Sequence, residues 1–128
     1  MERPLARFAD PIYALFRIVV GGLLLQHGAQ KLFGVLGGDT AKMGSQMWIG
    51  GLIELVCGLA VMVGYKVGWT ALLASGTMAV AYFQFHQPKG SLPIQNGGEL
   101  AAVYSFCFLL IAAKGPGIWS MSGRRGAS

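Results

Sequence analysis

The sequence predicts an all-α integral membrane protein, a single domain over residues 1–128 folded as a four-helix bundle with both termini in the cytoplasm. Three observations predict this class. Hydrophobic residues make up 54% of the 128 residues and charged residues only 12%, against about a quarter charged in average soluble proteins. The mean hydropathy is +0.56. The apolar residues gather in four runs, separated by loops rich in turn-forming residues.

Membrane spans are expected at about 12–33, 47–63, 68–86 and 99–114. The first span reaches about 33 Å at about 1.5 Å per residue, enough for a hydrocarbon core of about 30 Å. A cleaved signal peptide is the alternative for this run, but no small-residue cleavage site follows Leu25 and further apolar runs do. The short link 64–67 predicts that the second and third spans form an antiparallel hairpin.

The fourth apolar run is too short to cross alone, because Leu100 to Ala113 reaches only about 21 Å. Either Glu99 lies below the membrane surface, or residues 115–119 complete the crossing as a broken extension.

Basic residues set the expected orientation. Four crossings put the termini on one side, which carries Arg3, Arg7, Lys66, Lys114, Arg124 and Arg125, whereas the other carries Lys31, Lys42 and Lys89. The positive-inside rule then predicts a multi-pass protein of the plasma (inner) membrane with cytoplasmic termini. The net charge of +5 is spread singly between apolar runs, which favours lipid headgroups over nucleic acid as partners.

Small residues predict how the helices pack. Gly21, Gly28, Gly51 and Gly58 recur at seven-residue spacing within each span, which predicts close backbone contact and favours a homodimer, although the face is not readable from sequence. Cys57 and Cys107 lie 50 residues apart without a CxxC motif. They are interpreted as small apolar core residues, with a membrane dithiol as the alternative.

Polar residues within apolar spans mark the candidate site, because each ionisable group there costs about 2.5–3.5 kcal/mol on an insertion scale. These residues are Arg17, Gln26, His27, Lys31, Glu54, His86 and Glu99. His27, Lys31, Glu54, His86 and Glu99 are expected to converge in the outer half of the bundle. Arg17 precedes Lys31 by 14 residues and therefore points toward the same interior. Glu54 is too deep to reach water, so it must be protonated or paired with Arg17, His27 or Lys31.

Most of these residues also have a simpler interpretation. Arg17 can extend to cytoplasmic headgroups, and Glu99, after 96–98, can be a first-turn carboxylate that interacts with the helix dipole. Lys31 and His86 can mark the membrane interface, and Gln26 can form a hydrogen bond between helices.

Four segments carry a family resemblance: 17–34 (RIVVGGLLLQHGAQKLFG), 51–58 (GLIELVCG), 96–99 (NGGE) and 115–120 (GPGIWS). In this order they resemble the DoxX family of small four-span membrane proteins. The resemblance covers Arg17, His27, Lys31, Glu54 and Glu99, and His86 falls where the family often has a histidine. It implies a component of a membrane redox or thiol-homeostasis complex, such as one linked to thiosulfate:quinone oxidoreductase, while distant relatives act as scaffolds or cargo receptors.

The leading hypothesis is a redox-associated inner-membrane subunit that binds a quinone or a small sulfur-containing anion and acts with a redox partner protein. If the protein is an enzyme, it is expected to be a quinone-linked oxidoreductase. Reduction of a quinone needs side chains that can donate protons to its two oxygens. His27, Glu54 and His86 are therefore predicted to be catalytic. The predicted binding residues are Arg17, Gln26, Lys31, Asn96 and Glu99. No metal or haem is implied, because nothing around the two histidines selects iron.

Two other classes of function are considered. A non-catalytic scaffold or assembly partner would use Arg17, Glu54 and their neighbours to fix helix register. A small proton-coupled transporter would use the same groups as a relay, although no inverted repeat is present in the sequence.

Overall fold

The computed structural model describes residues 3–34 and 41–121, and within them the chain is all-α, as predicted. The four longer helices are α1 (Ala9–Phe33), α2 (Gln46–Val63), α3 (Val67–Ala81) and α5 (Glu99–Lys114). Short segments complete the fold: the 3-10 turns η1 (Ala6–Phe8) and η3 (Gln87–Lys89), the π turn η2 (Tyr82–His86) and the single turn α4 (Pro93–Asn96). Arg124 and Arg125, expected on the cytoplasmic side, lie outside the described residues.

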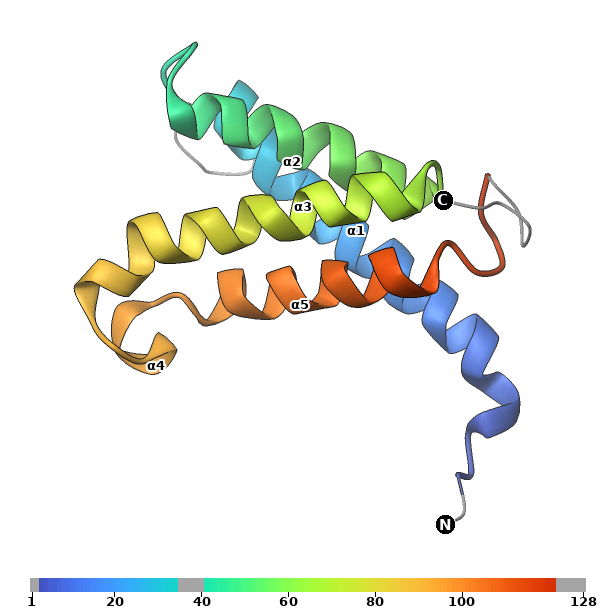
Figure 1. The fold of residues 1–128 in the computed structure, drawn as a ribbon. Helices are drawn as coiled ribbons and strands as arrows, with labels where there is room; N and C mark the ends of the chain where they lie inside the picture. The colour runs from blue at the N-terminus through green and yellow to red at the C-terminus, as the bar shows by residue number, and fades with distance from the viewer. Residues whose placement is uncertain (1–2, 35–40, 122–128) are drawn as a thin grey trace.

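The helices run between two ends of the molecule (Figure 1). The N-terminus of α1, the α2–α3 link and the C-terminus of α5 lie toward one side, here named the hairpin end, and α4 lies at the opposite end. α1 packs most extensively on α2, and α3 packs most extensively on α5. Polar residues at the two ends therefore belong to separate environments.

Two helical segments of the described chain are long and apolar enough to cross a membrane, 6–33 and 46–63. They correspond to the first two predicted spans. The third predicted span is an α-helix only to Ala81 and continues as the π turn to His86. The fourth corresponds to α5, which is followed by a non-helical segment over 115–121.

Local sequence explains where α2 begins and ends. The Ser45 hydroxyl accepts a hydrogen bond from the Trp48 backbone N–H at 3.1 Å, which caps the first turn. Gly64 closes the helix with φ of 80°, a left-handed conformation that glycine adopts without strain. Since α3 starts at Val67, the predicted tight hairpin between the second and third helices is confirmed.

Glycines bring the backbones of α1 and α2 into direct contact. A β-carbon on Gly28 would lie 2.5 Å from the Leu55 backbone nitrogen, and one on Gly58 would lie 2.7 Å from the Leu25 nitrogen. Only residues without a side chain permit this separation. The close approach predicted from the seven-residue spacing is therefore confirmed, and it is made within one chain.

α3 and α5 are joined by a reciprocal serine contact. The Ser75 hydroxyl donates to the Ser105 carbonyl at 2.7 Å, and the Ser105 hydroxyl donates to the Ser75 carbonyl at 3.1 Å. Cys57 lies in the apolar core and Cys107 packs against it, both as free thiols.

Candidate site between two cavities

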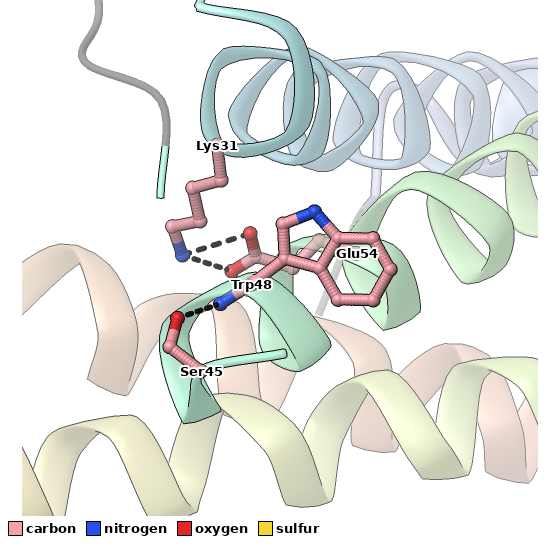
Figure 2. Close-up of polar contacts among 4 residues, drawn as sticks. All are labelled: Lys31, Ser45, Trp48 and Glu54. Atoms are coloured by element: carbon pink, nitrogen blue, oxygen red, sulfur yellow. Dashed lines mark hydrogen bonds and ion pairs between the residues drawn. The ribbon is translucent and has the colours of Figure 1, made fainter. Parts of the chain in front are cut away.

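An ion pair between α1 and α2 forms the centre of the candidate site. The Lys31 ammonium lies 2.8 Å from Glu54 Oε1 and 2.9 Å from Oε2 (Figure 2). Gly51 makes room for this contact, because a β-carbon there would lie 2.7 Å from Lys31 Cβ. Of the three partners predicted for Glu54, the structure selects Lys31.

The two carboxylate oxygens of Glu54 differ in how they are satisfied. Oε2 accepts a hydrogen bond from Lys31, whereas Oε1 is buried and close to the same ammonium but has no hydrogen-bond partner in the described chain. Glu54 as a whole is 3% exposed. Buried polar atoms are nearly always hydrogen-bonded in folded proteins, and Oε1 depends on the ion pair with Lys31 instead.

Two cavities meet at this ion pair. The larger, about 550 Å³, lies between α2 and the α3–η2 segment, and the smaller, about 190 Å³, lies between α1, α2, α3 and α5. Both are lined by Lys31, Glu54, Met78, Ala81 and His86. The larger one is otherwise mainly apolar, with Met47, Ile49, Ile53, Val80 and Phe85 in its wall. A molecule with a polar head and an apolar body matches this division.

Two histidines and a tyrosine complete the wall of the smaller cavity. His27 and Tyr104 meet edge to face, with ring centroids 5.9 Å apart, and His86 lines both cavities. Tyr104 is 5% exposed, and its hydroxyl has no hydrogen bond to the rest of the described chain. Sequence reasoning missed Tyr104, although a hydroxyl in the middle of an apolar span was a signal that could have found it.

Asn96 acts on the site through the loop that carries His86. Its side-chain amide donates to the Tyr82 hydroxyl at 3.1 Å and to the Gly90 carbonyl at 3.2 Å, and its backbone carbonyl lies 3.3 Å from His86 Nδ1. Gly98 packs directly on η2, since a β-carbon there would lie 2.7 Å from His86 Cβ. The loop therefore fixes where the imidazole lies.

Arg17 lies at the hairpin end, away from the other predicted site residues. As predicted it points into the interior, where it is fully buried. Its guanidinium donates to five backbone carbonyls, those of Val61, Met62, Pro116, Ile118 and Trp119. The expectation that Arg17 lies in the same site as Lys31 was wrong, and so was the alternative that its side chain extends to the lipid headgroups. The carbonyls at the end of α2 and in 116–119 occupy its hydrogen-bond donors instead.

Two further predicted residues lie outside both cavities. Gln26 is exposed on α1. Glu99 is exposed in the first turn of α5, where the helix dipole stabilises a carboxylate. Of the five ionisable groups expected to converge, four line the smaller cavity, and Glu99 does not. Within residues 3–34 and 41–121, no cluster of three or more His, Cys, Asp or Glu is placed to hold a metal ion.

Comparison with known proteins identifies relatives of the chain. The DoxX family model matches residues 12–87, a range that includes the Lys31–Glu54 pair and His86. A protein of Haemophilus influenzae, described as an uncharacterized protein, is 33% identical over 127 residues, which cover 94% of this chain and 95% of the relative. No solved structure matches the chain.

Proposed function

The chain belongs to the DoxX family, and from this premise we propose that it is a multi-pass inner-membrane subunit of a redox system that binds a quinone at the Lys31–Glu54 pair. One observation carries the proposal. Glu54 is almost fully buried and paired with Lys31, and both side chains line the two cavities, the larger of which is mainly apolar.

Four membrane crossings with cytoplasmic termini are part of the proposal. The helical path from Val67 to His86 is about 30 Å long, comparable to the hydrocarbon core. α5 alone is shorter, and the segment bound by Arg17 extends it. Arg3, Arg7, Lys66 and Lys114 lie near helix ends at the hairpin end, which supports a cytoplasmic location for that end.

The charges around the cavities favour a neutral headgroup over a small sulfur-containing anion. Lys31 is already paired with Glu54, and Arg17 is held at the other end of the molecule. An anion would therefore have to compete with the Glu54 carboxylate for the same ammonium. A quinone instead needs hydrogen-bond donors for its carbonyl oxygens and an apolar channel for its tail, and the larger cavity has a mainly apolar wall.

The side chains around the smaller cavity supply hydrogen bonds and protons. His27 and His86 are able to donate to the carbonyl oxygens of a quinone, as is the Tyr104 hydroxyl. Reduction to the quinol takes two electrons and two protons. In this proposal a partner redox protein delivers the electrons, and the imidazoles pass the protons, with Glu54 as the buried carboxyl group that exchanges protons with them.

Quinone binding is tested with decylubiquinone and protein reconstituted in liposomes. A hydrogen bond from a quinol hydroxyl to the Glu54 carboxylate involves a charged group, and such bonds contribute about 1.5–3 kcal/mol, so Glu54→Gln is expected to weaken binding of the reduced form, decylubiquinol, at least about tenfold. His27→Ala is expected to weaken binding as well. With the partner protein present, both variants are expected to lose quinone-dependent turnover.

The control is Ser75→Ala, which removes a buried hydroxyl of the α3–α5 contact that lies outside both cavities. It is expected to bind decylubiquinone as the wild type does. The proposal is wrong if folded Glu54→Gln protein binds decylubiquinol, and folded His27→Ala protein binds decylubiquinone, with unchanged affinity.

A scaffold function is the second candidate, favoured by the way in which Arg17 uses all its donors to hold backbone segments together. In that case the Lys31–Glu54 pair would only fix the register of α1 on α2. The double variant Lys31→Met/Glu54→Met distinguishes the two functions. A scaffold would keep its cellular function with this apolar pair, whereas a quinone site would lose binding in a protein that still folds.

A further inference from the structure

One face of α1 is exposed along the whole helix and carries a single polar side chain in an otherwise apolar row. Ile12, Val19, Gln26 and Phe33 follow one another at seven-residue intervals, and all four are exposed. Seven residues turn an α-helix to within about 20° of two full turns, so these side chains lie in one row. The row is opposite the buried side formed by Ala14, Arg17, Val20, Gly21, Leu24 and Gly28.

The depth of Gln26 makes its exposure costly. It lies about 21 Å along the helix from Ile12 and about 10 Å from Phe33, at the end of α1. The side chain is too short to reach headgroups over that distance. It makes no hydrogen bond to the described part of the chain, so toward lipid its amide N–H and C=O groups would remain unsatisfied, at a cost of several kcal/mol for each group.

We propose that this face of α1 binds the same face of a second copy of the chain. Two copies inserted in one orientation bring their α1 helices together in parallel, so that Gln26 meets Gln26 at equal depth across a two-fold axis. A glutamine amide both donates and accepts, and each copy therefore satisfies the other. A seven-residue apolar row with one amide is the pattern by which parallel helix pairs fix their register.

The exposed faces of α2 and α5, both within the described residues, lack such a signal. The exposed row of α2 is Leu52, Val56 and Leu59, and that of α5 includes Val103, Phe106 and Leu110, all of them compatible with lipid tails. The exposed amide of Gln84 is already bonded to Gln46. Gly21, Gly28 and Gly58 are used in the α1–α2 contact within the chain. The sequence favoured a homodimer but did not indicate which face forms it. This proposal assigns that interface to the exposed row of α1.

The test is cysteine cross-linking in native membranes, with Cys57 and Cys107 both replaced by alanine. Val19→Cys places a thiol in the proposed row and keeps Gln26, and mild oxidation is expected to give a product of twice the chain mass. The matched control is Val56→Cys on the exposed face of α2, with 56% exposure against 55% for Val19. It is expected to remain monomeric under the same conditions.

The role of the amide is tested by adding Gln26→Leu or Gln26→Asn to the Val19→Cys protein. Leucine is expected to weaken self-association about 3- to 30-fold, the range that corresponds to an interhelical hydrogen bond in membranes, and asparagine is expected to restore most of it. Photobleaching steps in liposomes measure association without a cross-link. Equal cross-linking at positions 19 and 56, unchanged association with leucine, or a product of another mass overturns the proposal. Quinone binding is a separate measurement.

Discussion

Two buried charged side chains show two ways of keeping a charge inside an apolar protein. Arg17 is surrounded by backbone carbonyls, which accept from each nitrogen of its guanidinium, and no carboxylate in the described part of the chain is paired with it. Glu54 instead takes one cation, Lys31, and leaves one oxygen without a hydrogen bond to the described residues. The first arrangement uses every donor for assembly, whereas the second places a charged pair in the wall of two cavities. The carboxylate is therefore the better candidate for function.

Loss of one partner of the Lys31–Glu54 pair is expected to destabilise the protein more than loss of both. Lys31→Met leaves the buried Glu54 carboxylate unpaired, and the free energy of unfolding of this variant should be lower than that of the wild type by about 3–5 kcal/mol. Glu54→Met should cost less, because Lys31, with a side chain 28% exposed, can extend toward water. The double variant should recover most of the loss. Denaturant unfolding in mixed micelles measures all three, and a double variant as unstable as Lys31→Met contradicts the argument.

Among the helices, α1 and α2 behave as one unit because glycines allow their backbones to touch. The contact places Lys31 directly over Gly51, and so sets the position of the ammonium relative to Glu54. α3 and α5 form the other unit through Ser75 and Ser105. The smaller cavity has walls from both units, so its shape depends on how they are held together.

Gly28→Ala is expected to separate α1 from α2. The new methyl group would lie 2.5 Å from the Leu55 nitrogen and 2.7 Å from the Gly51 carbonyl oxygen, and backbone atoms cannot move aside as a side chain can. A loss of at least about 1–3 kcal/mol is expected, as for overpacked cores, together with weaker quinone binding. The measurements are thermal unfolding in detergent and the decylubiquinone assay.

Gly22→Ala is the matched control on the same helix. Its methyl group would meet only the Met62 sulfur, at 3.4 Å, and that side chain is flexible. This variant should therefore be as stable as the wild type, or up to about 1 kcal/mol more stable because alanine restricts the unfolded chain. Equal losses from the two substitutions would contradict backbone contact at Gly28.

At the scale of the whole molecule, the two ends have different chemistry. At the hairpin end the polar groups are bonded among themselves, with Arg17 on 116–119 and the Tyr13 hydroxyl donating to the Gly115 carbonyl at 2.7 Å. Toward α4, polar groups line cavities. With the hairpin end in the cytoplasm, as we propose, the site opens near the outer face of the membrane.

Labelling from one side of the membrane tests this orientation. With Cys57 and Cys107 replaced by alanine, Lys89→Cys should react with a membrane-impermeant maleimide added to intact cells, because Lys89 is exposed near α4. Lys66→Cys, in the exposed α2–α3 link, should react only after the membrane is opened. Labelling of Lys66→Cys in intact cells would reverse the orientation, and labelling of both would contradict four crossings.

Much of the fold was predictable because it depends on local signals. The apolar runs gave the helices, Gly64 gave the hairpin, and the glycine spacing gave the α1–α2 contact. For the site, His27, Lys31, Glu54 and His86 were found because a polar side chain in an apolar run is visible from sequence alone. Tyr104 was missed because a tyrosine reads as an aromatic core residue until a cavity is seen beside it.

The sequence by itself determined which segments are helical and which polar groups are costly to bury, because both follow from hydrogen bonding and hydration along the chain. Only the tertiary structure decided which of those groups meet. Arg17 and Lys31 share a rotation on α1, but they are separated by about 21 Å along its axis. The carbonyls that bind Arg17 come from the end of α2 and from a segment about 100 residues away. Contacts over such separations depend on how helices pack, which local pattern does not contain.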